Sequence, residues 1–106
     1  MTILVMHAPY WRVHQEDVRS FERVFACGIG DGYAIPERLA LRLHAGCDVV
    51  LLSKDERKRA EGKLRELVPT SKTNSGMQRY DVYVENLERV PYKAEPLTRT
   101  GIAVFE

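Results

Sequence analysis

The sequence predicts a small α+β domain of about five strands, with two short helices after the first strand. Three observations indicate this class. Residues 46–53 form an apolar block that opens with Gly-Cys-Asp, which is typical of a buried strand. Residues 59–68 form a charge-rich segment of similar length, as expected of the half-exposed partner in a β-hairpin. Apolar residues at helical spacing occur ahead of this hairpin, in residues 14–26 and 36–43.

Length and composition limit the possibilities for the whole chain. With 106 residues, of which 44% are hydrophobic and 29% charged, residues 1–106 are expected to form one globular domain. The apolar runs are much shorter than the roughly 20 residues that cross a bilayer. The start of the chain also lacks the pattern of a signal peptide. We therefore expect a cytoplasmic protein that does not enter a membrane.

The cysteines and histidines do not indicate a metal or redox site. Cys27 and Cys47 lie far apart, without the Cys-x-x-Cys spacing that binds zinc or supports redox chemistry. His44 has no second ligand three or four residues away, so it is expected to favour the C-terminal dipole of a helix instead. The sequence predicts no metal and no cofactor.

An aromatic cluster follows the first predicted strand. Residues 2–6 are short and apolar, which suits a central strand covered on both faces. Tyr10, Trp11 and Arg12 come directly after it. An aromatic ring beside a guanidinium stacks well on a planar base, so the cluster is either a lid on the core or a binding platform. The lid is the simpler interpretation.

A glycine-rich segment separates the two predicted helices. Residues 14–26 predict an amphipathic helix that ends at Gly28, and residues 36–43 predict a second one that starts after a proline. Between them the glycines alternate, and Tyr33 follows the last of them. A loop that joins the helices is the simpler interpretation. The alternative is an anion site, in which the backbone amides of Gly28 and Gly30 approach a phosphate.

Residues 53–68 are ambiguous between helix and strand. Apolar residues at helical spacing allow a charged surface helix. However, Gly62 would cost a helix about 1 kcal/mol relative to alanine, whereas in a strand it marks a bulge or a close backbone approach. We favour the strand, with the charged residues 54–58 as the turn before it.

The rest of the chain is expected to add two strands. Residues 69–78 are polar and rich in turn-forming residues, which predicts a loop. Residues 79–85 alternate as a half-buried strand does. Residues 91–96 are bracketed by prolines and predict an irregular stretch, after which Gly101 precedes a closing strand at 102–105.

In this order of elements, two short motifs resemble the PUA-like superfamily, the small β-barrels that include the PUA, ASCH, EVE and YTH domains. Residues 46–52 resemble the family's Leu-x-x-Gly-Asp-x-Val/Leu strand entry, although here Cys47 stands between the glycine and the aspartate. Residues 59–64 are similar to its return strand, where a glycine lets the barrel turn. The resemblance covers residues 3–90 and implies a mixed β-barrel. It also implies that the chain binds RNA or a modified nucleotide in a cleft.

Candidate nucleic-acid-binding residues follow from this implication. Aromatic side chains would stack on bases, and lysine or arginine side chains would meet phosphates. The platform candidates are Tyr10, Trp11, Arg12 and Tyr33; the phosphate candidates are Lys54, Arg57, Lys58 and Arg59, together with the amides of Gly28 and Gly30. The simpler interpretation of the basic run is a solvated hairpin tip, because acidic neighbours dilute its field and the net charge of the chain is only +1.

Two other classes of function remain open. Some ASCH-type domains are amidohydrolases that use a Lys, a Thr or Ser and a Glu, and the sequence has Lys54, Lys63, Glu61 and Glu66 in the relevant segments. No nucleophile stands beside an obvious base, so we assign no catalytic residue and do not favour an enzyme. A protein-interaction module is the third possibility, through strand edges or residues 91–96.

Overall fold

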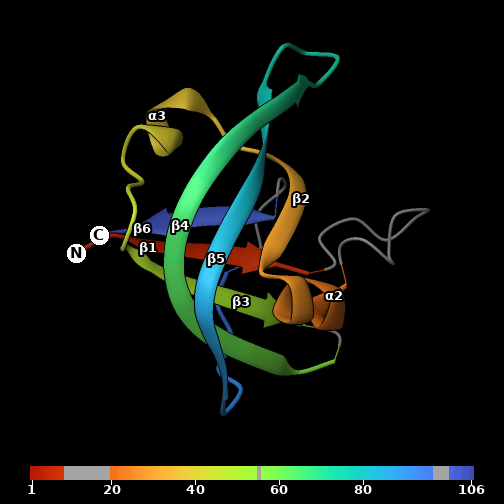
Figure 1. Ribbon diagram of the computed structural model, residues 1–106, viewed down its shortest axis with the longest axis vertical. Helices are drawn as coiled ribbons and strands as arrows, with labels where there is room; N and C mark the ends of the chain where they lie inside the picture. The colour runs from red at the N-terminus through yellow and green to blue at the C-terminus, as the bar shows by residue number, and fades with distance from the viewer. Residues whose placement is uncertain (9–19, 55, 97–100) are drawn as a thin grey trace.

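The computed structural model describes residues 1–8, 20–54, 56–96 and 101–106, and it places their strands in one curled, mixed sheet (Figure 1). In this part of the chain the sheet has six strands in the order β2-β5-β4-β3-β1-β6. The strands are β1 (Ile3–His7), β2 (Ile29–Ala34), β3 (Asp48–Ser53), β4 (Lys58–Lys72), β5 (Gln78–Val90) and β6 (Ile102–Phe105), and the helices are α2 (Phe21–Cys27) and α3 (Glu37–Ala40).

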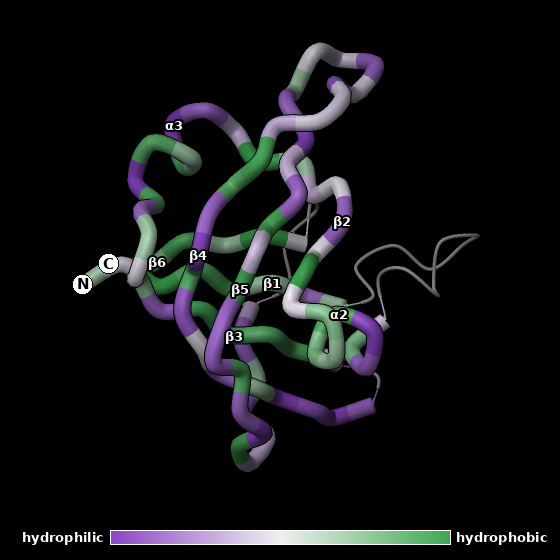
Figure 2. Tube along the Cα trace, viewed as in Figure 1, coloured by the Kyte–Doolittle hydropathy of each residue, from purple (hydrophilic) through white to green (hydrophobic). Residues whose placement is uncertain are grey.

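β1 and β3 are interior strands of the sheet and pair in parallel, with Ile3 opposite Asp48 and His7 opposite Leu52. Every other neighbouring pair is antiparallel. Both strands are nearly continuous runs of buried residues, as expected of strands covered on two faces. Figure 2 shows these hydrophobic runs, in contrast to the mixed colours along β4 and β5. The prediction of a central N-terminal strand is confirmed.

The β3–β4 hairpin confirms the strand interpretation of residues 53–68 and excludes the helix. β3 pairs with β4 from Asp48 opposite Lys63 to Ser53 opposite Lys58. β4 then continues for 15 residues beside β5, with three shifts of register along the pair. At one of them, a Cβ on Gly62 would lie 2.7 Å from the backbone oxygen of Glu85. The glycine therefore permits the close backbone approach that its position predicts.

Apolar side chains cover both faces of the sheet. The first face carries the larger cluster, which includes Leu4, Met6 and Leu51 of the sheet and Phe21 and Val24 of α2. The second face carries a smaller cluster, formed by Val5, Val50, Leu52 and Ala103, with Ile3 and Tyr92 packed against it. Successive residues of β1 and β3 thus contribute to opposite clusters, as the pleat of a strand requires.

Three boundaries differ from the sequence prediction. The glycine segment is not a loop: residues 29–34 form β2, which pairs with β5 and adds a strand to the expected five. The loop predicted at residues 69–78 is confined to residues 73–77, because β4 runs to Lys72 and β5 starts at Gln78. Cross-strand pairing thus overrides the local turn propensity of these residues. The predicted helix at 36–43 is shorter, with α3 covering only four residues.

The helix prediction for residues 14–26 is confirmed only in its last part. α2 begins at Phe21 after Ser20, whose hydroxyl accepts a hydrogen bond from the backbone N–H of Arg23 at 3.2 Å. It ends at Gly28, which has φ 72° as a left-handed C-cap. Residues 14–19 lie outside the described residues. Neither α2 nor α3 is long and apolar enough to cross a membrane.

Candidate nucleic-acid interface

The four basic side chains predicted to contact phosphates lie in the turn between β3 and β4 and at the start of β4. The hydroxyl of Ser53 accepts a hydrogen bond from the backbone N–H of Glu56 at 3.3 Å, which closes the turn. Arg57 has φ 52°, in the left-handed region that non-glycine residues seldom adopt. Lys58 and Arg59 then open β4 and, as consecutive strand residues, project to opposite faces of the sheet. The basic side chains therefore do not form one cluster, because Lys58 and Arg59 lie on different faces of the sheet.

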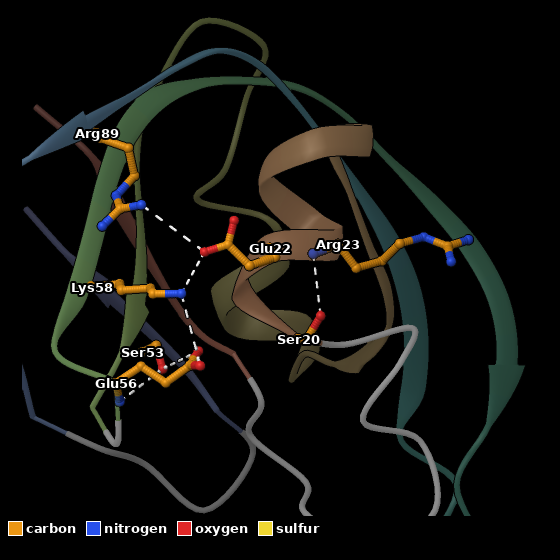
Figure 3. A network of polar contacts seen from close by, with 7 residues as sticks. All are labelled: Ser20, Glu22, Arg23, Ser53, Glu56, Lys58 and Arg89. Carbon is orange, nitrogen blue, oxygen red and sulfur yellow. Dashed lines mark hydrogen bonds and ion pairs between the residues drawn. The ribbon is translucent and has the colours of Figure 1, made fainter.

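Lys58 lies on the first face and is neutralised there. Its ammonium contacts Glu22 of α2 at 2.5 Å and Glu56 at 3.8 Å, and Arg89 of β5 approaches Glu22 at 4.0 Å (Figure 3). The hydrogen bond from Lys58 lowers the pKa of the Glu22 carboxyl. The same ammonium also lies 5.8 Å from the ring centre of Phe21. Lys58 therefore fastens α2 to the sheet, and two carboxylates already compensate its charge.

Arg59 lies on the second face and is neutralised by other carboxylates. Its guanidinium is paired with Glu61 and Glu95, each at 3.0 Å, and donates a hydrogen bond to the backbone oxygen of Lys93 at 2.8 Å. The side chain is only 9% exposed. We call residues 91–96 the strap, since Arg59 holds this irregular stretch against the sheet.

Arg57 and Lys54 keep their charges available. The guanidinium of Arg57 lies over the ring of Tyr92, 4.6 Å from its centre, in a cation–π contact. Within the described residues, neither Arg57 nor Lys54 has a carboxylate within ion-pair distance. Both side chains belong to the turn, and Arg57 is exposed. These two residues are the basic groups of the turn that could meet a phosphate.

The sequence did not single out Tyr92. Its ring is half-buried, packs against the cluster of Val50 and Leu52 on the second face, and bears Arg57. The available signal was an aromatic residue beside Lys93 in a stretch bracketed by prolines. That stretch was assigned only to possible protein partners. The partner of Tyr92 lies 35 positions away along the chain, so only the fold brings the two together.

His7 is a second residue that the sequence did not single out. It ends β1 on the second face, and its imidazole is buried, with the residue 2% exposed. The ring Nε2 lies 3.0 Å from the backbone oxygen of Pro96 in the strap. Burial lowers the pKa of His7, and the nearby charge of Lys54 lowers it further. His7 thus places a neutral imidazole at the end of the sheet that carries the turn.

Tyr33, Gly28 and Gly30 have structural roles, which corrects their assignment to a ligand site. Tyr33 is 0% exposed, and its hydroxyl donates to the backbone oxygen of His7 at 2.8 Å, so its ring has no face on which a base could stack. Gly28 donates its N–H to Val24 within the end of α2. A Cβ on Gly30 would lie 2.5 Å from the Cε of Met6, so this glycine makes room for packing.

An amide of the glycine segment does bind a carboxylate, but one from this chain. The N–H of Gly32 donates to Asp81 of β5 at 3.0 Å, and the guanidinium of Arg79 donates to the backbone oxygen of Gly32 at 2.8 Å. The backbone at this point is therefore committed to holding β2 against β5. The segment expected to be a loop, with a phosphate site as the alternative, is thus a strand whose polar groups at Gly32 bond within the sheet.

The remaining candidates divide into two groups. Tyr10, Trp11 and Arg12 lie outside the described residues, so the platform that they predict stays a prediction. Of the four residues considered for an amidohydrolase, two are in separate ion pairs, Lys63 with Asp48 and Glu61 with Arg59. In the part of the chain that the structure describes, no three His, Cys, Asp or Glu side chains gather as metal ligands.

No protein-family model, curated protein or solved structure matches the chain. The resemblance to PUA-like domains therefore rests on the sequence motifs. The case for a function rests on the side chains described above, at the end of the sheet formed by the β3–β4 turn, His7 and the strap.

Proposed function

We propose that this chain is a PUA-like nucleic-acid-binding domain, which holds single-stranded RNA or a modified nucleotide at the β3–β4 turn. The observation that carries the proposal is the contact between Arg57 and Tyr92. A guanidinium stacked on an aromatic ring offers a planar, positively charged surface, and unpaired bases stack on such surfaces in RNA-binding proteins. The sheet supports the proposal because it is curled, as the wall of a small barrel is.

The charges of the turn support a ligand that carries few phosphates. Lys58 and Arg59 are compensated by carboxylates, which leaves Lys54 and Arg57 for phosphate oxygens. Each phosphate neutralised on a single strand contributes about −0.7 to the slope of log affinity against log salt. Two contacts predict a slope of about −1.4, which is shallow for a nucleic-acid-binding protein. The ligand is therefore a short single-stranded segment or a single nucleotide and not a long duplex.

The first prediction concerns Arg57. Arg57→Asn removes the guanidinium while keeping a residue that tolerates the left-handed backbone at this position. We expect the affinity for a labelled single-stranded RNA to fall about 5- to 150-fold, because base stacking is worth about 1–3 kcal/mol. The salt slope is expected to become shallower by about 0.7. Fluorescence anisotropy over a range of salt concentrations measures both quantities.

The matched control is Arg65→Asn. Arg65 is exposed on β4 and has no ion pair with any described residue, so this variant removes the same charge away from the turn. Its affinity and salt slope should stay close to those of the unmodified protein. Equal losses in the two variants would indicate a general effect of charge and would contradict a site at Arg57. Absence of RNA and nucleotide binding by the unmodified protein would contradict the function itself.

A further inference from the structure

His7 presents one hydrogen-bonding atom that nothing in the described structure uses. Its backbone N–H donates to the oxygen of Gly101 at 2.9 Å, and its backbone oxygen accepts from the hydroxyl of Tyr33 at 2.8 Å. The ring Nε2 bonds to the oxygen of Pro96 at 3.0 Å. The ring Nδ1 is buried and has no hydrogen-bond partner among the residues that the structure describes. Three anchors therefore fix a residue whose fourth polar atom is unpaired.

The partner of Nε2 determines the chemical nature of Nδ1. A backbone oxygen can only accept, so Nε2 must carry the hydrogen that it donates to Pro96. In a neutral imidazole the other nitrogen then has a lone pair and acts as an acceptor. The lowered pKa of His7 is consistent with this neutral form. Nδ1 is thus a fixed acceptor to which none of the described residues donates.

Leaving such an atom unpaired has a cost that a ligand could relieve. A buried polar group without a partner destabilises a fold, and native structures contain few of them. His7 lies on the same face as the Arg57–Tyr92 contact: it is in register with Leu52, which belongs to the cluster that Tyr92 packs against. The strap carries both Tyr92 and the Pro96 that anchors the ring. The strap therefore links the imidazole to the proposed site.

We propose that Nδ1 of His7 accepts a hydrogen bond from an N–H group on the edge of the bound base. This proposal rests on the proposed function and adds a group that contacts the edge of the base. An acceptor at this position pairs with an exocyclic amine, as in adenine, cytosine and guanine, or with a ring N–H, as in guanine, uracil and hypoxanthine. A base whose donor nitrogen is fully methylated cannot make the bond and leaves Nδ1 unpaired.

The variant that isolates this bond is His7→Gln. The amide nitrogen of glutamine reaches about as far as Nε2 and can still donate to Pro96, but glutamine has no acceptor at the position of Nδ1. The matched control is His44→Gln, since His44 is exposed and its ring nitrogen contacts only the neighbouring backbone oxygen of Ala45. Circular dichroism and thermal unfolding of both variants check that the fold is retained.

The binding experiment compares AMP, CMP, UMP and IMP with forms methylated at the amine or the ring nitrogen. In the unmodified protein and in His44→Gln, methylation of the donor in the preferred nucleotide is expected to weaken binding about 10- to 100-fold, as loss of a buried hydrogen bond does. In His7→Gln the same methylation should change affinity less than about threefold. Which nucleotide shows the effect distinguishes an exocyclic amine from a ring N–H.

Nitrogen-15 NMR of the unmodified protein tests the proposal even where the variant does not fold. The free protein should show a neutral His7 with a proton on Nε2 and an unbonded Nδ1, and the preferred nucleotide should shift the Nδ1 resonance. An Nδ1 already hydrogen-bonded in the free protein, or unmoved when the nucleotide binds, overturns the proposal. An equal methylation effect in His7→Gln also overturns it. In each case the nucleotide still binds, so the proposed function is judged separately.

Discussion

At the start of β4, two neighbouring basic residues each hold another segment against the sheet, one on each face. On the first face, Lys58 ties α2 to the sheet through Glu22, a carboxylate that is 59% exposed. On the second face, Arg59 ties the strap through Glu95 and Lys93, with a guanidinium that is 9% exposed. The two basic residues are neighbours in sequence, but Lys58 is 25% exposed and Arg59 9%, and their partners Glu22 and Glu95 are 59% and 22% exposed. We therefore expect the Lys58 contact to be replaceable and the Arg59 contact to be required for stability.

The apolar clusters explain this asymmetry. The first face has a large cluster, to which α2 contributes Phe21 and Val24, so the helix remains held by packing without its ion pair. The second face has a small cluster, and of the strap only Tyr92 packs against it. The rest of the strap is an irregular segment that polar bonds from Arg59 and His7 hold in place. Polar contacts therefore contribute more to stability on the second face, where less apolar surface is buried.

The largest expected effect follows from removing the contacts of Arg59 with the strap. Arg59→Met removes the guanidinium and leaves the carboxylate of Glu95 and the oxygen of Lys93 without their donor. Loss of one partner of a buried ion pair costs about 3–5 kcal/mol. We expect a fall of about 3 kcal/mol in the free energy of unfolding, at the lower end because Glu61 is half exposed. Urea denaturation measures this change.

The control for Arg59→Met is Arg65→Met on the same strand. Arg65 is exposed and without an ion pair in the described part of the chain, so its loss should change stability by less than about 0.5 kcal/mol. Hydrogen exchange should also increase in residues 91–96 of Arg59→Met and stay unchanged over α2. Similar exchange on the two faces would contradict the assignment of Arg59 to the strap.

A smaller effect on the same face is a dependence of stability on pH through His7. The unfolded chain titrates His7 near its ordinary pKa of 6.5, and burial lowers the pKa in the fold. Between these two pKa values the unfolded state binds more protons, so the free energy of unfolding falls as the pH drops below 6.5. The fall ends below the folded pKa. The charge of Lys54 opposes a proton on His7, whereas the hydrogen bond to Pro96 and the charge of Glu95 favour it.

His7→Gln separates this dependence from that of other groups. It should remove the slope of stability between pH 7 and the folded pKa, while His44→Gln should keep it. The slope below pH 4.5 belongs to carboxyls with lowered pKa values, such as Glu22, and should survive in both variants. Thermal unfolding over a range of pH values gives the comparison. An unchanged slope in His7→Gln would show that the imidazole is not the group that titrates.

The sequence predicts the elements of this fold better than the contacts between them. Alternation and apolar runs correctly located β1, β3 and β6, and Gly62 correctly indicated a strand in place of a helix. β2 was missed because glycines lack the side chains that produce a periodic pattern, and only pairing with β5 makes the segment extended. The sequence of β2 therefore gives little indication of a strand, because its extended conformation depends on pairing with β5.

Only the part of the candidate site that consists of consecutive residues could be predicted from the sequence. The basic run at the β3–β4 turn was visible, but sequence alone could not show that Lys58 and Arg59 face opposite ways toward different carboxylates. Tyr33 is an aromatic residue of the kind that stacks on bases, but it is buried in the core. Burial is possible because its hydroxyl donates to a backbone oxygen inside the fold. The pairs Arg57 with Tyr92 and His7 with Pro96 join residues far apart in the chain.

The smallest expected effect comes from removing the ion pair between Lys58 and Glu22. Lys58→Met and Glu22→Gln, singly and together, form a double-mutant cycle for the ion pair that links β4 to α2. Because Glu22 is largely exposed, solvent screens the pair, and the measured coupling should be far below the loss in Arg59→Met. At about 1 M salt the Debye length falls to about 3 Å, close to the separation of the two charges, so the coupling should weaken. A coupling that salt does not weaken, or that matches the Arg59 effect, would mean that α2 depends on this ion pair and not on the packing of Phe21 and Val24.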